Sequence, residues 1–327
     1  MYKFLYLKNK SLSKLKFILF ISFLLYFLST NLIYSHSIQK DEDYLIPMGN
    51  LIQIDAELEN LVVKNFIEGS SFCVGDSILK VNGTKINSYK DFTDLLSNLS
   101  IKDEVVVLVK RGENTFSFKT TKDELEKINC NNYISGFATL TYINPKTNKF
   151  GAVGHPISIG LARKVPIKNG NIYTTKDLTI DKSSRGHVGC INAVRKDVIG
   201  EFTHNSDFGI KGEIATFKDS LLKPYKVASL DEVKLGKAQI ILQTGSYTKD
   251  AFDIQIVDIQ LQHSPKAKTF KIKVVDKDLL ALTGGIVQGM SGAPIVQGDK
   301  IIGAVSHAIE NNPALGYAVY IKWMNEN

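Results

Sequence analysis

The second half of the chain alternates short apolar runs with turns that contain glycine or proline. The runs are rich in β-branched and aromatic residues and have the usual length of β-strands. Residues 133–327 are therefore expected to form one domain of many short strands, a barrel or a sandwich. Strands are expected at residues 136–143, 150–153, 172–174, 239–243, 252–260, 269–275, 285–287, 294–296, 301–306 and 317–321.

A smaller unit precedes this domain, over residues 40–125. In residues 74–86 an alternating apolar strand leads into Asn82-Gly83, a dipeptide that strongly favours a hairpin turn. Residues 88–99 place apolar side chains on one helical face, and Ser88 is suited to cap that helix. Further strands are expected at residues 51–54, 61–63, 105–109 and 115–119.

The order of these elements, and the run VGDSILKVNG at residues 74–83, resembles a PDZ domain. Such domains add an extended peptide to a sheet edge and often hold its carboxylate in a loop. Residues 46–50 lie where that loop would be, although they match it poorly. Peptide capture and docking onto the second domain both remain open. The charged stretch at residues 122–132 is expected to be a linker, with room for one helical turn.

The first 35 residues predict a signal peptide or a membrane anchor. Five lysines precede or begin an apolar run at residues 15–28, which is the order of a secretory signal. Positive charge stays on the cytoplasmic side, so the rest of the chain is expected to be exported. No clear cleavage site follows the run, and both fates of the segment remain open.

The charge and the cysteines limit the other functions. The net charge of +7 arises mostly at the N-terminus, because 35 basic residues outside those five lysines nearly balance 33 acidic ones. The sequence therefore gives no support for nucleic-acid binding. Cys73, Cys130 and Cys190 are widely spaced and form no metal-binding pattern, so neither a metal nor another cofactor is expected.

The most informative segment is GMSGAP at residues 289–294. It resembles the G-x-S-G-x-P nucleophile loop of chymotrypsin-like peptidases. A nucleophilic serine needs a tight turn that exposes its hydroxyl and aims backbone N–H groups at the developing oxyanion. Ser291 is therefore the candidate nucleophile, and the N–H groups of Gly289 and Ser291 are candidates for the oxyanion hole. A glycine-rich turn without catalytic function is the alternative.

His155 is the candidate base that would activate this serine. It ends the apolar run at residues 150–154 and precedes Pro156, at a corner where a side chain can project into a cleft. It also precedes Ser291 in the chain, as the base does in chymotrypsin-like peptidases. The other histidines lie in the targeting segment, in polar stretches or after the serine: His36, His187, His204, His263 and His307.

Four segments, at residues 136–155, 205–212, 283–294 and 303–317, resemble the stage IV sporulation protein B peptidases. The resemblance implies a chymotrypsin-like β-barrel peptidase domain that is made in the forespore and exported to the space between the spore membranes. It implies that the protein cleaves itself and a membrane-bound regulator there. That cut would release an intramembrane protease and so signal to a sigma factor in the other compartment.

The resemblance also implies a third catalytic residue, Asp276, which would orient the imidazole and stabilise its charged form. It lies fifteen residues before Ser291. Other carboxylates remain alternatives for this role: Asp177, Asp181, Asp207, Asp253, Asp258 and Asp278.

Two functions of other classes remain open. One is an inert scaffold that holds a partner through the PDZ-like unit, and the other is an anchored binding protein of the cell surface. After His155-Pro156-Ile157-Ser158 the chain has Ile159-Gly160, where the family often has an acidic residue. This departure leaves the substrate preference open.

Overall fold

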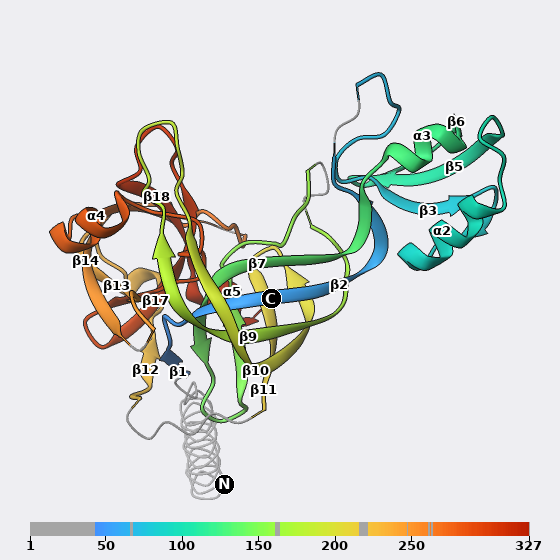
Figure 1. Cartoon of the computed structure of the whole chain (residues 1–327). Helices are drawn as coiled ribbons and strands as arrows, with labels where there is room; N and C mark the ends of the chain where they lie inside the picture. Colours follow the sequence, from blue (N-terminus) through green and yellow to red (C-terminus); the bar gives the residue numbers. More distant parts are fainter. Residues whose placement is uncertain are drawn as a thin grey trace, which may run out of the picture. The chain divides into compact units, whose positions relative to one another are not determined.

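The computed structural model describes residues 43–65, 68–160, 164–215, 222–246, 248–260, 262 and 264–326. Figure 1 shows the chain as a cartoon. The predicted signal peptide or anchor at residues 1–35 lies outside the described residues. Across the described ranges, no helix is long and apolar enough to cross a membrane.

The described residues are mainly β-structure. The strands are β1 (Tyr44–Pro47), β2 (Leu51–Val63), β3 (Ser77–Val81), β4 (Thr84–Lys85), β5 (Glu104–Arg111), β6 (Asn114–Thr121), β7 (Cys130–Ile143), β8 (Lys149–Ala152), β9 (Ile167–Ile180), β10 (Ile191–Ser206), β11 (Gly209–Ile214), β12 (Tyr225–Val227), β13 (Gly236–Gln243), β14 (Lys249–Ile259), β15 (Phe270–Val274), β16 (Pro294–Gln297), β17 (Lys300–Ala308) and β18 (Leu315–Tyr320). The helices are α2 (Tyr89–Ser97), α3 (Lys122–Lys127), η1 (Leu230–Glu232), α4 (Lys277–Thr283) and α5 (Ile321–Glu326).

Two groups of strands make up the larger part of the fold. The first group joins β2 with β7 and β9, and extends through β8, β10 and β11. Its core contains the fully buried Ile52, Phe150 and Ile210. The second group contains β12 to β18, with a core around Ile240 and Phe270. Strand β1 links the two groups, because its first half pairs with β12 and its second half with β7.

The PDZ-like unit has its own core, formed by β3, β5, α2 and α3 with the ends of β2 and β7. Its predicted local features are confirmed. Asn82 and Gly83 both have positive φ, 47° and 80°, as a two-residue hairpin turn requires. The side chain of Ser88 accepts a hydrogen bond from the Asp91 N–H and caps α2.

The structure places part of the predicted unit 40–125 with the larger strand groups. Residues 44–58 pair with strands of the two larger groups, not with the PDZ-like strands. Residues 46–50 are consequently not a carboxylate-binding loop: the Met48 and Gly49 N–H groups donate to carbonyls of β7, and Met48 is buried. The alternating pattern of β2 predicts a strand correctly, but it cannot show which sheet that strand joins.

Residues 122–132 contain the helical turn that the sequence allows, but they do not form a separate linker. They include α3 and the start of β7, and Leu125 and Cys130 are both buried in the PDZ-like core. Where the chain leaves β2 and returns in β7, Val63 lies opposite Cys130. The PDZ-like unit is thus an insertion between two strands that pair with each other.

Two further expectations fail in the second domain. Residues 285–287 do not form a strand, because Gly284 and Gly285 have positive φ and turn the chain after α4. The long pair of β9 and β10, at residues 167–180 and 191–206, was predicted only at residues 172–174. Much of β10 is exposed and polar, so its sequence lacks the apolar run that marks a buried strand.

Candidate active site

Ser291 lies in a tight turn between α4 and β16. Gly289 and Gly292 flank it with φ of 99° and 94°, a region that side chains other than glycine rarely adopt. A Cβ atom on Gly292 would lie 2.3 Å from the Thr139 carbonyl oxygen. The predicted need for glycine is therefore met at both positions, by backbone conformation and, at Gly292, by close packing as well.

Two threonines of β7 hold this turn from behind. Thr139 Oγ1 donates to the Gly289 carbonyl at 2.7 Å, and its N–H donates to the Ser291 carbonyl at 2.8 Å. Thr141 Oγ1 donates to the Gly292 carbonyl at 2.7 Å. Both threonines are fully buried. The sequence interpretation missed them, although two threonines at alternate positions of an apolar run are a signal that a buried strand face needs hydrogen bonds.

The two N–H groups predicted for the oxyanion hole are in keeping with that role. Among the described residues, neither the Gly289 nor the Ser291 N–H has an acceptor. The carbonyls of the same two residues are held by Thr139, which fixes the turn. The arrangement leaves two donors to interact with an anionic oxygen.

His155 lies within hydrogen-bond distance of the serine, with Nε2 3.1 Å from Ser291 Oγ. The chain reaches it from β8 through Val153 and Gly154, which both have positive φ. A Cβ on Gly154 would lie 2.6 Å from the Val305 carbonyl of β17, so this corner fits closely against the second group of strands. The structure thus brings together two residues that are 136 positions apart in the chain.

The other ring nitrogen of His155, Nδ1, lies 2.9 Å from the Pro156 carbonyl oxygen. A carbonyl oxygen only accepts hydrogen bonds, so the proton of the neutral ring sits on Nδ1. The lone pair of Nε2 then faces the Ser291 hydroxyl, as a general base requires. Burial lowers the pKa of His155 below its ordinary value of 6.5, and the bond to Pro156 only partly opposes this shift.

The prediction that Asp276 is the third catalytic residue is not met. Asp276 is the N-cap of α4, and its carboxylate accepts backbone N–H groups from Asp278 and Leu279, both at 3.0 Å, and from Asp253 at 3.2 Å. These hydrogen bonds lower the pKa of the Asp276 carboxyl, and the bond from the Leu279 N–H contributes most. The carboxylate stabilises a helix end, and the Pro156 carbonyl occupies the place at His155 Nδ1 that an aspartate would take.

The alternative carboxylates do not fill that place either. In the described part of the chain, no carboxylate forms a hydrogen bond with His155. Asp207 pairs with Lys164 at 2.8 Å, and Asp181 pairs with His187 at 3.0 Å. Of the other histidines, His204 lines a different cavity, and His36 and His263 lie outside the described residues.

Asn205 supports the loop that carries Pro156. Its Oδ1 accepts the Ile157 N–H at 2.9 Å, and its Nδ2 donates to the carbonyls of Ile157 and Val165 at 3.0 and 2.9 Å. The three partners are backbone groups: two belong to Ile157 in the loop after His155, and one belongs to Val165, whose N–H donates to the Ile157 carbonyl. Asn205 fell within a segment that resembled a peptidase family, but nothing in the residue type alone indicated this role.

His307 is a second histidine beside Ser291 and His155. Its ring centroid lies 5.3 Å from that of His155, and its Nδ1 lies 3.1 Å from Ser306 Oγ. Burial, with repulsion from His155 and Lys268, lowers the pKa of His307 to about 4. The ring is therefore neutral near pH 7 and covers one side of the His155 imidazole without adding charge.

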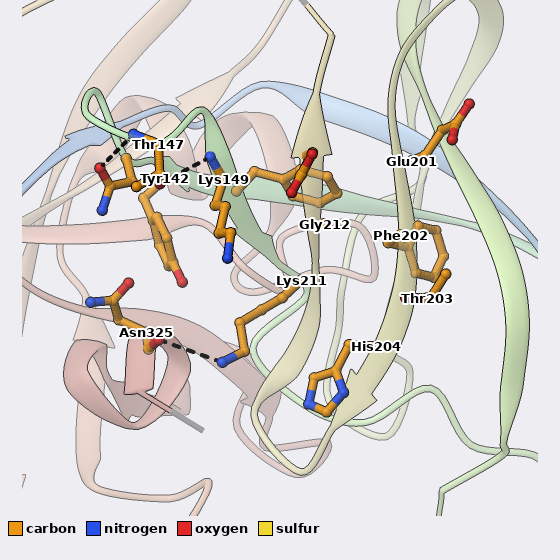
Figure 2. A pocket seen from close by; sticks show the side chains of 13 residues that line it. Tyr142, Thr147, Lys149, Glu201, Phe202, Thr203, His204, Lys211, Gly212 and Asn325 are labelled. Carbon is orange, nitrogen blue, oxygen red and sulfur yellow. Dashed lines mark hydrogen bonds between the residues drawn. The ribbon is translucent and has the colours of Figure 1, made fainter.

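Ser291 and His155 line a cleft of about 270 Å³. A larger cavity of about 610 Å³ contains neither Ser291 nor His155. Figure 2 shows Lys149 and Lys211 extending into that larger cavity beside Tyr142, and Lys211 Nζ donates to the Asn325 carbonyl at 3.4 Å. The smaller cleft is therefore the one that contains the Ser291–His155 pair.

Parts of the chain are similar to known proteins. A PDZ domain model matches residues 52–121. The pro-apoptotic serine protease NMA111 of Kluyveromyces lactis is 32% identical over 72 residues, which are 21% of this chain and only 7% of that protein. The crystal structure of the inactive form of Rv3671c protease shares 15% identity over 58% of this chain and 81% of that chain, with a TM-score of 0.32.

A fourth match covers more than half of the chain, residues 128–325, and includes both His155 and Ser291. It is to the family model described as SpoIVB peptidase S55. The protein is thus a serine peptidase that carries a PDZ domain. The chain belongs to the SpoIVB peptidase S55 family.

Proposed function

We propose that Ser291 is the nucleophile, His155 the general base, and the Gly289 and Ser291 N–H groups the oxyanion hole of a Ser–His dyad. The observation that carries this proposal is the 3.1 Å contact between Ser291 Oγ and His155 Nε2 in an open cleft. The backbone carbonyl of Pro156 accepts the hydrogen bond from His155 Nδ1 that a carboxylate accepts in a Ser–His–Asp triad.

The reaction follows from these positions. Ser291 Oγ attacks the substrate carbonyl carbon while its proton passes to His155 Nε2, and the carbonyl oxygen becomes anionic between the two free N–H groups. The imidazolium then gives the proton to the leaving amine nitrogen, and the peptide bond breaks. Water, deprotonated by the same nitrogen, hydrolyses the acyl-enzyme. The Pro156 carbonyl keeps the ring in the required tautomer throughout.

The two groups of strands support a chymotrypsin-like double-barrel arrangement as part of this proposal. His155 follows β8 of the first group, and Ser291 precedes β16 of the second. A site assembled from both groups is accessible at their junction and is rigid on each side.

The biological role extends the same proposal. The chain is exported, anchored or released by its N-terminal segment, and it acts during sporulation in the space between the spore membranes. There it cleaves itself and a membrane-bound regulator of an intramembrane protease, and the PDZ domain holds a peptide of a partner or substrate. Family membership and the lysine-rich, apolar N-terminus support this role.

A labelling experiment on the full chain, purified in mild detergent, tests the catalytic part. Wild type should react with a fluorophosphonate probe and release fragments whose new N-termini can be sequenced. Ser291→Ala should do neither, and Thr203→Ala, on the exposed part of β10, should behave as wild type. Labelling that persists in Ser291→Ala would assign the nucleophile to another residue.

The sporulation role needs a separate test in a spore-forming host. Replacement of the native gene by the Ser291→Ala allele should block processing of the regulator and the later sigma-factor response. Normal sporulation with a stable, unlabelled Ser291→Ala protein would instead favour a scaffold.

A further inference from the structure

The active-site cleft is apolar over most of its length. Ile134 and Phe137 of β7 line it, together with Ile54 of β2 and Ile157 of the loop after His155. Apart from His155, none of the residues that line it carries an ionisable side chain. A charged group entering this cleft would lose hydration without gaining a partner, whereas an aliphatic or aromatic group would be stabilised.

The position of the cleft shows which half of a substrate it would hold. It is lined by His155 and the three residues after it, but by none of the described residues of β17. His155 must deliver its proton to the leaving amine, so the residues that follow the cut bond lie on the His155 side. The acyl half lies toward β17, where the Ser306 carbonyl is 3.5 Å from Ser291 Oγ.

The backbone along this cleft is also free to pair. The Thr139 N–H points toward Ser291, whereas the next N–H, of Leu140, points the other way to Asn50. Directions alternate along a strand, so the backbone groups of Phe137 and Ser135 face the Ser291 side as well. In the described chain, no strand pairs with that edge of residues 134–138. An extended peptide leaving the nucleophile has an open strand edge beside it.

We propose that this cleft is the subsite for the first residue after the cut bond, and that it selects a bulky apolar side chain there. The side chain enters between Ile134 of β7 and Ile157 of the histidine loop, while the peptide backbone runs along the β7 edge. The proposal rests on the proposed roles of Ser291 and His155. It identifies the substrates as proteins with an exposed, extended segment whose newly formed N-terminus is an aliphatic or aromatic residue.

A peptide-library digest with the full chain in detergent tests this selection. Mass spectrometry of the products gives the residue at each new N-terminus. We expect leucine, isoleucine, methionine or phenylalanine to exceed aspartate, glutamate, lysine and arginine by at least about tenfold after correction for library composition. Ile134→Glu should reverse the order, with lysine and arginine gaining about tenfold because the cleft then holds an unpaired carboxylate.

The matched control is Val198→Glu, which places the same charge on an exposed position of β10, outside the cleft. It should keep the wild-type preference. Labelling of Ser291 by a fluorophosphonate separates the two proposals. Three results with a labelled wild-type enzyme overturn the subsite alone. They are no preference at the new N-terminus, no cut peptide, or an Ile134→Glu variant that keeps the apolar preference. An enzyme that is not labelled at Ser291 removes the catalytic proposal, and the subsite with it.

Discussion

Ser291 and Asp276 stand on either side of the short helix α4, and the structure treats them in opposite ways. The turn of Ser291 is held through its backbone carbonyls by Thr139 and Thr141, which leaves the serine hydroxyl free to face His155. At Asp276 the side chain itself fixes the backbone, because both carboxylate oxygens accept hydrogen bonds from backbone N–H groups.

The difference shows what makes a polar side chain available for chemistry. A catalytic group must be fixed by neighbours that do not use its reactive atoms. Ser291 meets this condition, and a carboxylate that already accepts three hydrogen bonds does not. Both residues were predicted to be catalytic, and their hydrogen-bond partners in the structure separate them.

The largest expected effect is the loss of either member of the pair. Ser291→Ala or His155→Ala should reduce turnover by about a millionfold, as loss of the nucleophile or base does in serine proteases. Self-cleavage followed on gels and by N-terminal sequencing measures this. The double variant should be no slower than either single one, and a clearly additive loss would show that the two residues do not act as a unit.

A smaller effect is expected at Asn205, which holds the histidine loop through backbone groups. Asn205→Ala removes the partner of the Ile157 N–H and of the Val165 carbonyl and leaves the Ile157 carbonyl with the Val165 N–H alone, at a cost of about 1–3 kcal/mol in the folding of this loop. Turnover should fall by about ten- to a hundredfold while fluorophosphonate labelling slows in parallel. Asn169→Ala, which removes an exposed side-chain contact with Glu57, is the control and should remain active.

The pH dependence tests the environment of the base. His155 works as a base only when neutral, and burial lowers its pKa below 6.5, so activity should persist below pH 6.5 and fall only at more acid pH. His307→Ser uncovers one side of the imidazole, which should raise the pKa of His155 and move the acid limb of kcat/KM upward. An acid limb that stays in place would show that the His307 ring does not contribute to this burial.

The smallest effect on activity is expected at Asp276. Asp276→Asn should retain turnover within a few fold, because asparagine also caps helices and no contact with His155 is lost. Asp276→Ala should lower the free energy of unfolding by about 1 kcal/mol through the lost cap of α4. This contribution is present above the ordinary pKa of the carboxyl, 3.8, and is lost as the pH falls through its lower folded value. A millionfold loss in Asp276→Asn would restore it to the catalytic site.

The sequence predicts features that depend on neighbouring residues, but it does not predict which distant residues pair with each other. The Asn82-Gly83 turn and the Ser88 cap depend on residues within a few positions, so their patterns predict them directly. The pairing of residues 44–58 depends on strands as distant in the chain as Lys226, the partner of Tyr44, and both candidate sheets would accept an alternating strand. The orientation of His155 depends on a backbone carbonyl, which any residue type supplies.

The two points at which the PDZ domain joins the peptidase strands determine which deletion variants can keep the peptidase fold. Its two ends, Val63 and Cys130, are cross-strand neighbours, and such neighbours have Cα atoms only about 5 Å apart. Residues 64–129 could therefore be excised as a cassette and replaced by a two-residue turn, with every peptidase strand retained. An N-terminal truncation that begins the chain at residue 128 would instead remove β1 and β2. It would also remove Ile52 and Ile54 from a hydrophobic core.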